Sequence, residues 1–193
     1  MTEGVDRRID QRDVDVRGTR IHLETAGTGP PLLYLHDAGD LGPWPPALTA
    51  LAERFGVHRP DHPGFNASGD NDSIDRVHDL AFFHLDLLDA LALSSVIVVG
   101  MSLGGWLAAD IAALEPSRVD RLVLVAASGV RAEVPTPDVF ALSPVELAEH
   151  MFHTDAARSA AIERAAAIEQ DPPLFERYLR NRMATANLGW NRS

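Results

Sequence analysis

Five consecutive residues, Gly100 to Gly104, have the types and spacing of a reactive serine site. In the pattern G-x-S-x-G, here centred on Ser102, the serine occupies a sharp turn between a strand and a helix, and the turn exposes its hydroxyl. Side chains at Gly100 and Gly104 would collide with neighbouring backbone in such a turn. Once a base has taken its proton, a serine held in this way can attack an acyl carbon.

The flanking segments match the strand and the helix that this turn requires. Residues 96–99 are Val-Ile-Val-Val and predict an interior strand, because β-branched side chains favour extended backbone. Residues 103–114 are mostly apolar and predict a helix that ends before Pro116. The start of this helix would lie beneath Ser102, where the N–H of Leu103 and the helix dipole can stabilise an oxyanion. The alternative is an ordinary glycine-rich turn between the strand and the helix, without a reactive serine.

Strand and helix patterns alternate along the first 130 residues, which predicts an α/β fold with a mostly parallel central sheet and helices on both faces. A hairpin is expected around Arg17-Gly18. A helix is expected at 74–91, with Asp72 or Ser73 as its N-cap. Further strands are predicted at 32–35, 57–59 and 122–127, and a further helix at 46–55.

The pattern changes after Val130, where alanine, glutamate and proline become frequent and only helices are predicted. We therefore expect two domains. Residues 1–130 would form the core with the sheet, and residues 131–193 a helical cap or lid segment, with the boundary near Arg131.

The composition excludes several classes of site. The net charge is −11 and acidic residues are spread along the chain, so no basic patch is expected for nucleic acid or an anionic membrane. The chain has no cysteine, which excludes disulfides, thiolate metal sites and a cysteine nucleophile. No apolar run approaches the length of a membrane span, and residues 1–10 are unlike a signal peptide. We expect a cytoplasmic protein with no metal and no cofactor.

Three motifs give the chain a resemblance to the α/β-hydrolase fold family, in particular to the N-terminal part of members with a helical cap. They are Leu-His-Asp-Ala-Gly at 35–39, Arg-Pro-Asp-His-Pro-Gly-Phe at 59–65 and Gly-Met-Ser-Leu-Gly-Gly-Trp at 100–106. The resemblance implies a serine hydrolase with Ser102 as nucleophile. It also implies that the N–H of Ala38, two residues after His36, completes the oxyanion hole with Leu103. Asp37 departs from the usual glycine, which places a carboxylate beside the hole and removes the freedom to adopt positive φ.

The resemblance also implies a catalytic acid and a histidine, in this order after the serine. No residue of this chain matches either position, because no strand pattern follows Ala127. Some relatives carry the acid after the strand that precedes the cap, but residues 126–129 read Ala-Ala-Ser-Gly. We therefore expect a chain truncated before these two residues.

Two histidines follow Ser102 in the sequence, His150 and His153, within residues 143–161, a segment of helical periodicity. A spacing of three would place both on one side of a helix. They could form a rescued triad or a metal pair, but an exposed helix face explains them as well. Five large side chains of the cap segment could line a pocket or form the cap's own core, which we favour: Phe140, Met151, Phe152, Phe175 and Tyr178.

The remaining histidines that we consider have structural interpretations. His84 lies on an apolar helical stripe, and His78 lies one turn from Ile74, so both are predicted to be packed in the core. His36 and His62 belong to the loop motifs, where a structural hydrogen-bonding role is expected.

Two functions remain open from the sequence. The first is hydrolysis of carboxylic esters or related acyl compounds through Ser102 and an acyl-enzyme, impaired in the isolated chain because the acid and the histidine are missing. The second is a catalytically dead remnant or an interaction module that retains the fold. Because residues Leu122 to Ala127 are continuously apolar, we also expect an exposed sheet edge there, open to self-association or to a complementing chain.

Overall fold

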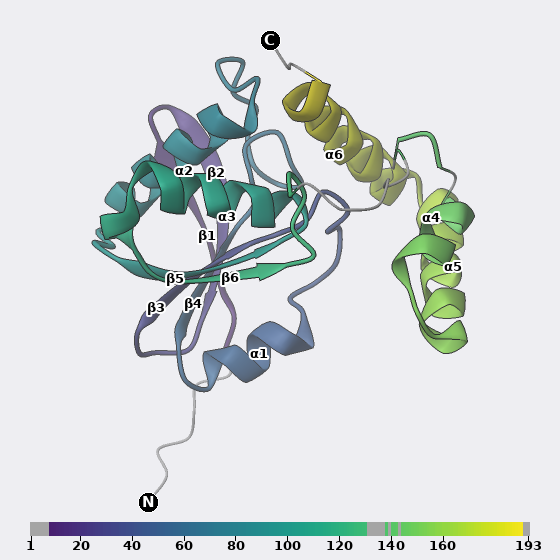
Figure 1. Cartoon of the computed structure of the whole chain (residues 1–193), viewed down its shortest axis with the longest axis horizontal. Helices are drawn as coiled ribbons and strands as arrows, with labels where there is room; N and C mark the ends of the chain where they lie inside the picture. The colour runs from purple at the N-terminus through teal and green to yellow at the C-terminus, as the bar shows by residue number, and fades with distance from the viewer. Residues whose placement is uncertain (1–7, 131–137, 139, 143, 191–193) are drawn as a thin grey trace, which may run out of the picture. The chain divides into compact units, whose positions relative to one another are not determined.

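A six-stranded, mostly parallel sheet with helices on both faces forms the centre of the computed structural model (Figure 1), which describes residues 8–130, 138, 140–142 and 144–190. The strand order is β1-β2-β4-β3-β5-β6. β1 and β2 form an antiparallel hairpin, β2 is antiparallel to β4, and the remaining neighbours are parallel. The predicted fold class is confirmed. The strands are β1 (Asp10–Val16), β2 (Thr19–Ala26), β3 (Pro31–Leu35), β4 (Gly56–Pro60), β5 (Val96–Met101) and β6 (Val119–Val125).

Helices α2 and α3 cover one face of this sheet, and α1 covers the other (Figure 1). Among the residues that the structure describes, three further helices follow β6. None of the described helices is long and apolar enough to cross a membrane. The helices are α1 (Pro46–Ala52), α2 (Val77–Ala90), α3 (Leu103–Leu114), the short 3-10 helix η1 (Pro116–Arg118), α4 (Pro144–Met151), α5 (Asp155–Gln170) and α6 (Pro172–Trp190).

Contacts divide the chain into two compact units. One comprises Met1–Gly129 with Arg180–Ser193, and the other Val130–Leu179. The C-terminal half of α6, from Arg180, therefore belongs with the sheet, although the sequence pattern placed it in the cap segment. The domain boundary that the sequence predicts near Arg131 stays a prediction.

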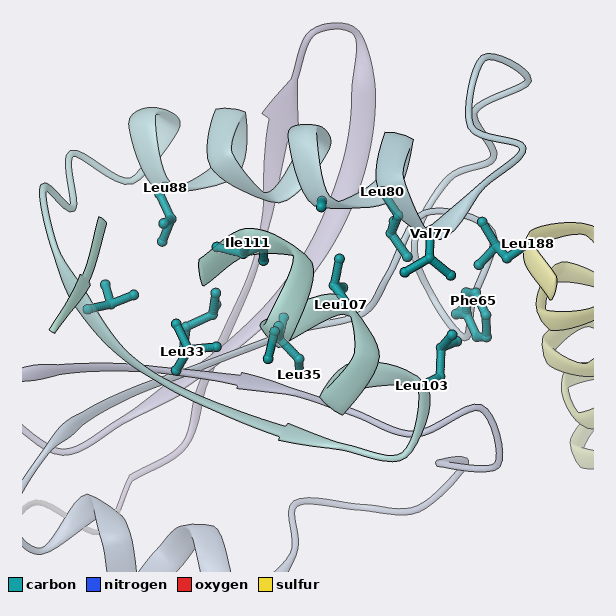
Figure 2. Packing of buried hydrophobic residues seen from close by; sticks show 14 residues of the cluster. Leu33, Leu35, Phe65, Val77, Leu80, Leu88, Leu103, Leu107, Ile111 and Leu188 are labelled. Carbon is teal, nitrogen blue, oxygen red and sulfur yellow. The ribbon is translucent and has the colours of Figure 1, made fainter. Parts of the chain in front are cut away.

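The main core lies between the sheet and α3. Leu103, Leu107 and Ile111 follow one another at intervals of four residues along α3, so they share one face, and all three are buried. Figure 2 shows this face opposite Leu33 and Leu35 of β3. The packing fixes the helix, and with it the position of Ser102 at the helix start.

Several predicted element ends were wrong, and the helix predicted at 46–55 already ends at Ala52. The helix predicted from residue 74 begins at Val77, and neither Asp72 nor Ser73 caps it. The carboxylate of Asp79 accepts the backbone N–H of Arg76 instead, while Asn71 accepts both the N–H and the hydroxyl of Ser73 in a local turn.

The last strand spans Val119–Val125 rather than residues 122–127. It ends because Ala126 has a positive φ of 44°, which an extended strand cannot include. β6 is also the last strand in the sheet order, so no described strand pairs with its outer edge. Four of its apolar residues are 39–45% exposed: Leu122, Val123, Leu124 and Val125.

The packing of α3 leads to a first prediction. Leu107→Ala removes a fully buried side chain and should lower the free energy of unfolding by about 3 kcal/mol, through lost burial and the cavity left behind. Phe82→Ala is the matched control, because the Phe82 side chain on α2 is 50% exposed, and it should change stability by less than about 1 kcal/mol. Urea denaturation measures both. Equal losses would contradict the assignment of α3 as the central core helix.

Candidate active site

Ser102 lies in a strained turn between β5 and α3. Its backbone angles are φ 52° and ψ −113°, a conformation that non-glycine residues rarely adopt and that costs roughly 1–3 kcal/mol. A Cβ at Gly100 would collide with the carbonyl oxygen of Gly104, and one at Gly104 with the carbonyl oxygen of Leu35. Both collisions agree with the close approach that the sequence predicts for these glycines. The geometry is that of a serine held out of the regular backbone at the start of a helix.

The segment that follows β6 holds this turn in place. The N–H of Ser102 donates to the carbonyl of Val125 at 3.0 Å, and the N–H of Ser128 donates to the carbonyl of Ser102 at 2.9 Å. Between them, a Cβ added to Gly105 would lie only 2.6 Å from the Cβ of Ala127, so this approach is close. The hydroxyl oxygens of Ser102 and Ser128 are 3.3 Å apart.

The two candidate oxyanion donors belong to segments that lie at the same end of adjacent strands. Leu35 of β3 is paired with Gly100 of β5, and a Cβ at Gly104 would also approach the carbonyl of His36 within 2.7 Å. The start of α3 thus lies against the loop that contains Ala38. Leu103 is the first residue of α3, where a backbone N–H has no carbonyl of its own helix to bind. The roles of Ala38 and Leu103 stay predictions.

Asp37 fits this loop without backbone strain, because it is not among the residues with positive φ. The freedom of a glycine is therefore not needed at this position. One carboxylate oxygen of Asp37 accepts the N–H of Gly39 at 2.5 Å. Desolvation by burial and the nearby charge of Asp40 raise the pKa of Asp37, and the N–H of Gly39 opposes this shift.

Three buried histidines lie beneath the loops that follow β3 and β4. His36, His62 and His84 are fully buried, and His36 and His62 stack with ring centroids 3.9 Å apart. The N–H of His62 donates to His36 Nε2 at 3.1 Å, and His36 Nδ1 lies 2.7 Å from the carbonyl of Asp37. His36 is therefore satisfied as a neutral ring protonated on Nδ1. The predicted structural roles of His36, His62 and His84 agree with this network.

The His62–His84 pair has more hydrogen-bond positions than protons. His62 Nε2 lies 3.1 Å from the carbonyl of His36, and His84 Nδ1 lies 2.9 Å from that of Leu80, so both contacts need an N–H. His62 Nδ1 and His84 Nε2 are 3.1 Å apart, which needs a third proton. Two neutral rings carry only two protons. A third would place a positive charge in the core, and this same burial lowers the pKa of His84 to about 4 and holds that of His62 well below its usual value.

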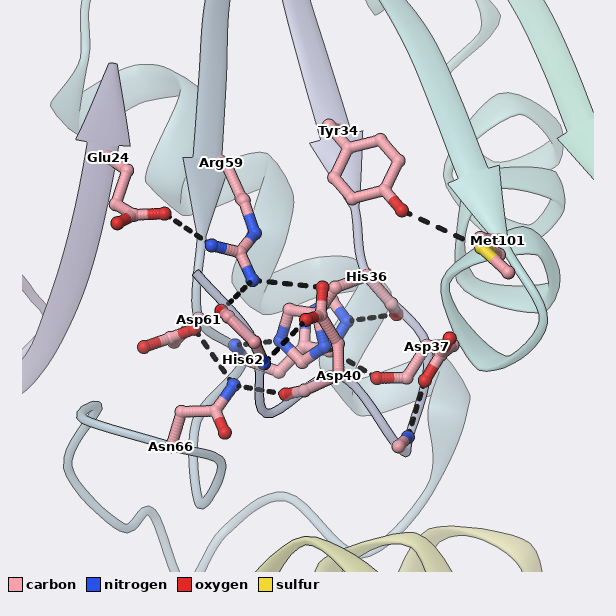
Figure 3. Close-up of polar contacts among 12 residues, drawn as sticks. Glu24, Tyr34, His36, Asp37, Asp40, Arg59, Asp61, His62, Asn66 and Met101 are labelled. Carbon is pink, nitrogen blue, oxygen red and sulfur yellow. Dashed lines mark hydrogen bonds and ion pairs between the residues drawn. The ribbon is translucent and has the colours of Figure 1, made fainter. Parts of the chain in front are cut away.

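A buried ion cluster around Arg59 fixes the same loops (Figure 3). The guanidinium of Arg59 pairs with Glu24 on β2 and with Asp40, the latter at 2.9 Å. The carbonyl of Asp40 accepts the side-chain amide of Asn66 at 2.9 Å. Burial, followed by the charges of Asp40 and Asp37, raises the pKa of Tyr34 to about 12. The loops that follow β3 and β4 are thus tied to one another.

The end of α6 is anchored to the loop after β4. Asn181 is fully buried; its side-chain oxygen accepts the N–H of Asn66, and its side-chain amide donates to Asn66 Oδ1, both at 3.0 Å. Arg180 donates to the carbonyls of Asn66 and Ser68 at 2.7 and 2.8 Å. The sequence carries no signal for Arg180, Asn181 or Ser128, since no periodicity or motif marks a polar residue whose partner is more than 25 positions away.

Three predicted histidine placements were wrong. The His78 side chain is 55% exposed rather than packed in the core, and its Nδ1 lies 3.5 Å from a carboxylate oxygen of Asp110. His150 and His153 do not share one helix, because α4 ends at Met151 and His153 lies before the start of α5. Among the described residues, the side-chain partner of Ser102 Oγ is Ser128, and no histidine or carboxylate lies within hydrogen-bonding distance of it.

Comparisons with known proteins agree with this geometry. Residues 30–191 match the sequence profile of a family described as "alpha/beta hydrolase fold". The chain is 40% identical over 111 residues to a pimeloyl-[acyl-carrier protein] methyl ester esterase of Nitrosomonas europaea, covering 56% of this chain and 41% of the relative. It is 33% identical over 124 residues to a 2-hydroxymuconate semialdehyde hydrolase of a Pseudomonas species, covering 62% and 44%.

The structural similarity extends further along the chain. The 2-hydroxy-6-oxo-6-phenylhexa-2,4-dienoate hydrolase of Rhodococcus superposes with a TM-score of 0.69 at 20% identity, over 93% of this chain and 72% of that one. The aligned region spans less than half of the length of the two curated relatives above.

The buried histidine pair leads to a prediction about pH. Unfolded His84 binds a proton near pH 6.5 and folded His84 near pH 4, so stability should fall as pH decreases through this window, by about 3 kcal/mol for this group alone. His84→Gln should reduce the pH dependence of the free energy of unfolding between pH 4 and 6.5, while buried His62 retains part of it. The control Phe82→Ala removes an exposed side chain that does not titrate and should keep the wild-type slope. Unchanged slopes in both variants would show that His84 is protonated in the folded protein.

Proposed function

Because this chain belongs to the α/β-hydrolase fold family, we propose that it hydrolyses carboxylic esters or related acyl compounds with Ser102 as the nucleophile. The observation that carries the proposal is the backbone of Ser102, whose φ of 52° places a non-glycine residue in a strained conformation at the start of α3. Strain of this kind persists where the surrounding structure enforces it, and it clusters at active sites. The relatives whose names include a methyl ester esterase support the same substrate class.

The reaction follows from the placement of these groups. Ser102 Oγ attacks the acyl carbon while a base accepts its proton, and the carbonyl oxygen takes up the negative charge. The N–H groups of Ala38 and Leu103 would donate to this oxyanion. Collapse of the tetrahedral intermediate expels the alcohol, and water then releases the acid from the acyl-enzyme. No metal or organic cofactor enters this scheme.

The described residues near Ser102 do not supply the base. A histidine and a carboxylate would have to come from a partner chain, from an unsuspected histidine or from a longer parent sequence. Disabling a serine–histidine–acid unit costs on the order of a millionfold in rate. We therefore propose that the isolated chain binds acyl substrates and reacts once with activated ones, but turns over esters poorly.

Ser102 can be tested with a fluorophosphonate probe, which forms a bond to an exposed nucleophilic serine and releases fluoride. The wild-type chain should be labelled slowly at a single site, and Ser102→Ala should abolish labelling. Hydrolysis of p-nitrophenyl acetate should stay within about tenfold of the Ser102→Ala variant, because no base is in place. Intact mass spectrometry and peptide mapping identify the site.

Fast turnover that disappears in Ser102→Ala would show that the chain does supply a base. His150→Ala and His153→Ala would then identify it. Labelling of another residue, unchanged in Ser102→Ala, would contradict the proposed nucleophile.

A second candidate function, an interaction module that retains the fold without turnover, is favoured by β6. Val123 and Val125 are 45% and 43% exposed on a strand whose outer edge is unpaired among the described residues. Such an edge is a template for pairing with another strand. We propose that it pairs with a second copy or with a complementing chain.

The edge is tested by oligomeric state. The wild-type chain should elute as an oligomer in size-exclusion chromatography with light scattering and should bind a hydrophobic dye. Val123→Lys should shift the population toward monomer, since a charge on an edge strand opposes pairing. Phe82→Lys is the control, because it changes an exposed apolar residue away from β6. A wild-type monomer without dye binding would contradict this proposal.

A further inference from the structure

We propose that Ser128 is a further catalytic residue, whose hydroxyl donates a hydrogen bond to Ser102 Oγ and stabilises the negative charge that develops on this oxygen during attack. The inference rests on the proposed role of Ser102 as nucleophile. It adds a group that the sequence motifs do not contain, contributed by the segment after β6.

Two contacts join Ser128 to the nucleophile. Its hydroxyl oxygen lies 3.3 Å from Ser102 Oγ, and its backbone N–H donates to the carbonyl of Ser102 at 2.9 Å. The backbone contact fixes the distance between the two residues, so the side-chain contact does not depend on a mobile loop. This backbone contact therefore holds Ser128 close to the reacting oxygen of Ser102.

The position of Ser128 is set by its neighbours rather than by its side chain. Ala126 has a positive φ of 44°, which turns the chain out of β6, and Val125 accepts the N–H of Ser102 at 3.0 Å. Ala127 is small enough to approach Gly105. Since these contacts are made by backbone and small side chains, removal of the Ser128 hydroxyl should leave the turn in place.

The direction of the hydrogen bond follows from the chemistry of the step. In the resting site either hydroxyl can donate. As the bond from Ser102 Oγ to the acyl carbon forms, the proton of Ser102 passes to an imidazole base or, without one, to water, and the π electrons move to the carbonyl oxygen. Ser128 keeps its own proton throughout and becomes the only possible donor of the pair. A hydrogen bond to a charged oxygen is stronger than a neutral one, so the contact strengthens toward the transition state.

Partial exposure limits the size of this effect. Ser128 is exposed, and the 3.3 Å separation is longer than a usual hydroxyl hydrogen bond. We expect loss of the hydroxyl to slow attack by about tenfold, less than the 100-fold or more that follows loss of a buried oxyanion donor. Ser128→Ala removes the hydroxyl, and Ser128→Thr retains it at an exposed position.

The test is the rate at which a fluorophosphonate labels Ser102, a reaction that forms the O–P bond, expels fluoride and delivers the serine proton to water. Ser128→Ala should label about tenfold more slowly than wild type, and Ser128→Thr within about twofold of it. Because labelling accelerates as the hydroxyl ionises, the rate–pH profile of Ser128→Ala should shift by about one unit to higher pH. Ser117→Ala, a change of an exposed serine that binds Glu115, should leave rate and profile unchanged.

The outcomes separate this proposal from the proposed function. Wild-type protein that is not labelled at Ser102 would overturn the nucleophile, and Ser128 with it. Labelling of wild type and Ser128→Ala at equal rates and with the same pH profile would overturn the role of Ser128 alone. Slow labelling of both Ser128→Ala and Ser128→Thr, with lowered melting temperatures, would show a structural role only and would also overturn the proposal.

Discussion

The constraint on which the site depends is the backbone of Ser102. A non-glycine residue with φ 52° persists only when its surroundings enforce that conformation. Here the carbonyl of Val125 and the N–H of Ser128 bind it from one side, while α3 follows at once on the other. The glycines at 100 and 104 are required because a Cβ at either position would meet a carbonyl oxygen. The packed helix α3 and these contacts of β6 and Ser128 together hold Ser102 in this turn.

A buried polar layer supports the two loops beside the turn. The rings of His36 and His62 stack beneath the loop that contains Ala38, and Arg59 is paired with carboxylates on both sides. Polar groups of this kind are costly to bury unless they are satisfied, so they fix the loops in one arrangement. The His62–His84 pair is the exception, because it has one contact more than its protons can fill. A fall in pH should therefore affect the loops of the site through protonation of this pair.

The strand that holds the serine turn is also the exposed edge of the sheet. β6 supplies the carbonyl of Val125 and leads into Ser128, yet its apolar side chains are about 40% exposed and its outer edge has no described partner. Pairing along this edge would therefore act directly on the segment that holds Ser102. Pairing along the edge of β6 and the position of Ser102 are therefore physically linked.

The sequence alone determined the parts of this protein that depend on local pattern. The β-branched run at 96–99, the apolar helix at 103–114 and the glycines around Ser102 predicted the strand, the helix and the turn, because propensity and steric exclusion act between near neighbours. The family motifs identified the fold for the same reason, since they are contiguous. Local pattern also misled, as with His78, whose spacing from Ile74 suggested burial although its side chain is exposed.

Only the tertiary structure decided which distant residues meet. Ser128 lies 26 positions from Ser102, and Asn181 lies 115 positions from Asn66, yet each pair is in hydrogen-bond contact. The contact between the rings of His62 and His84 likewise depends on how a loop packs against a helix. Such contacts depend on how strands and helices pack, and no property of the single residues encodes the partner. The sequence determined that Ser102 lies in a turn between a strand and a helix. Tertiary packing decided which residues surround it.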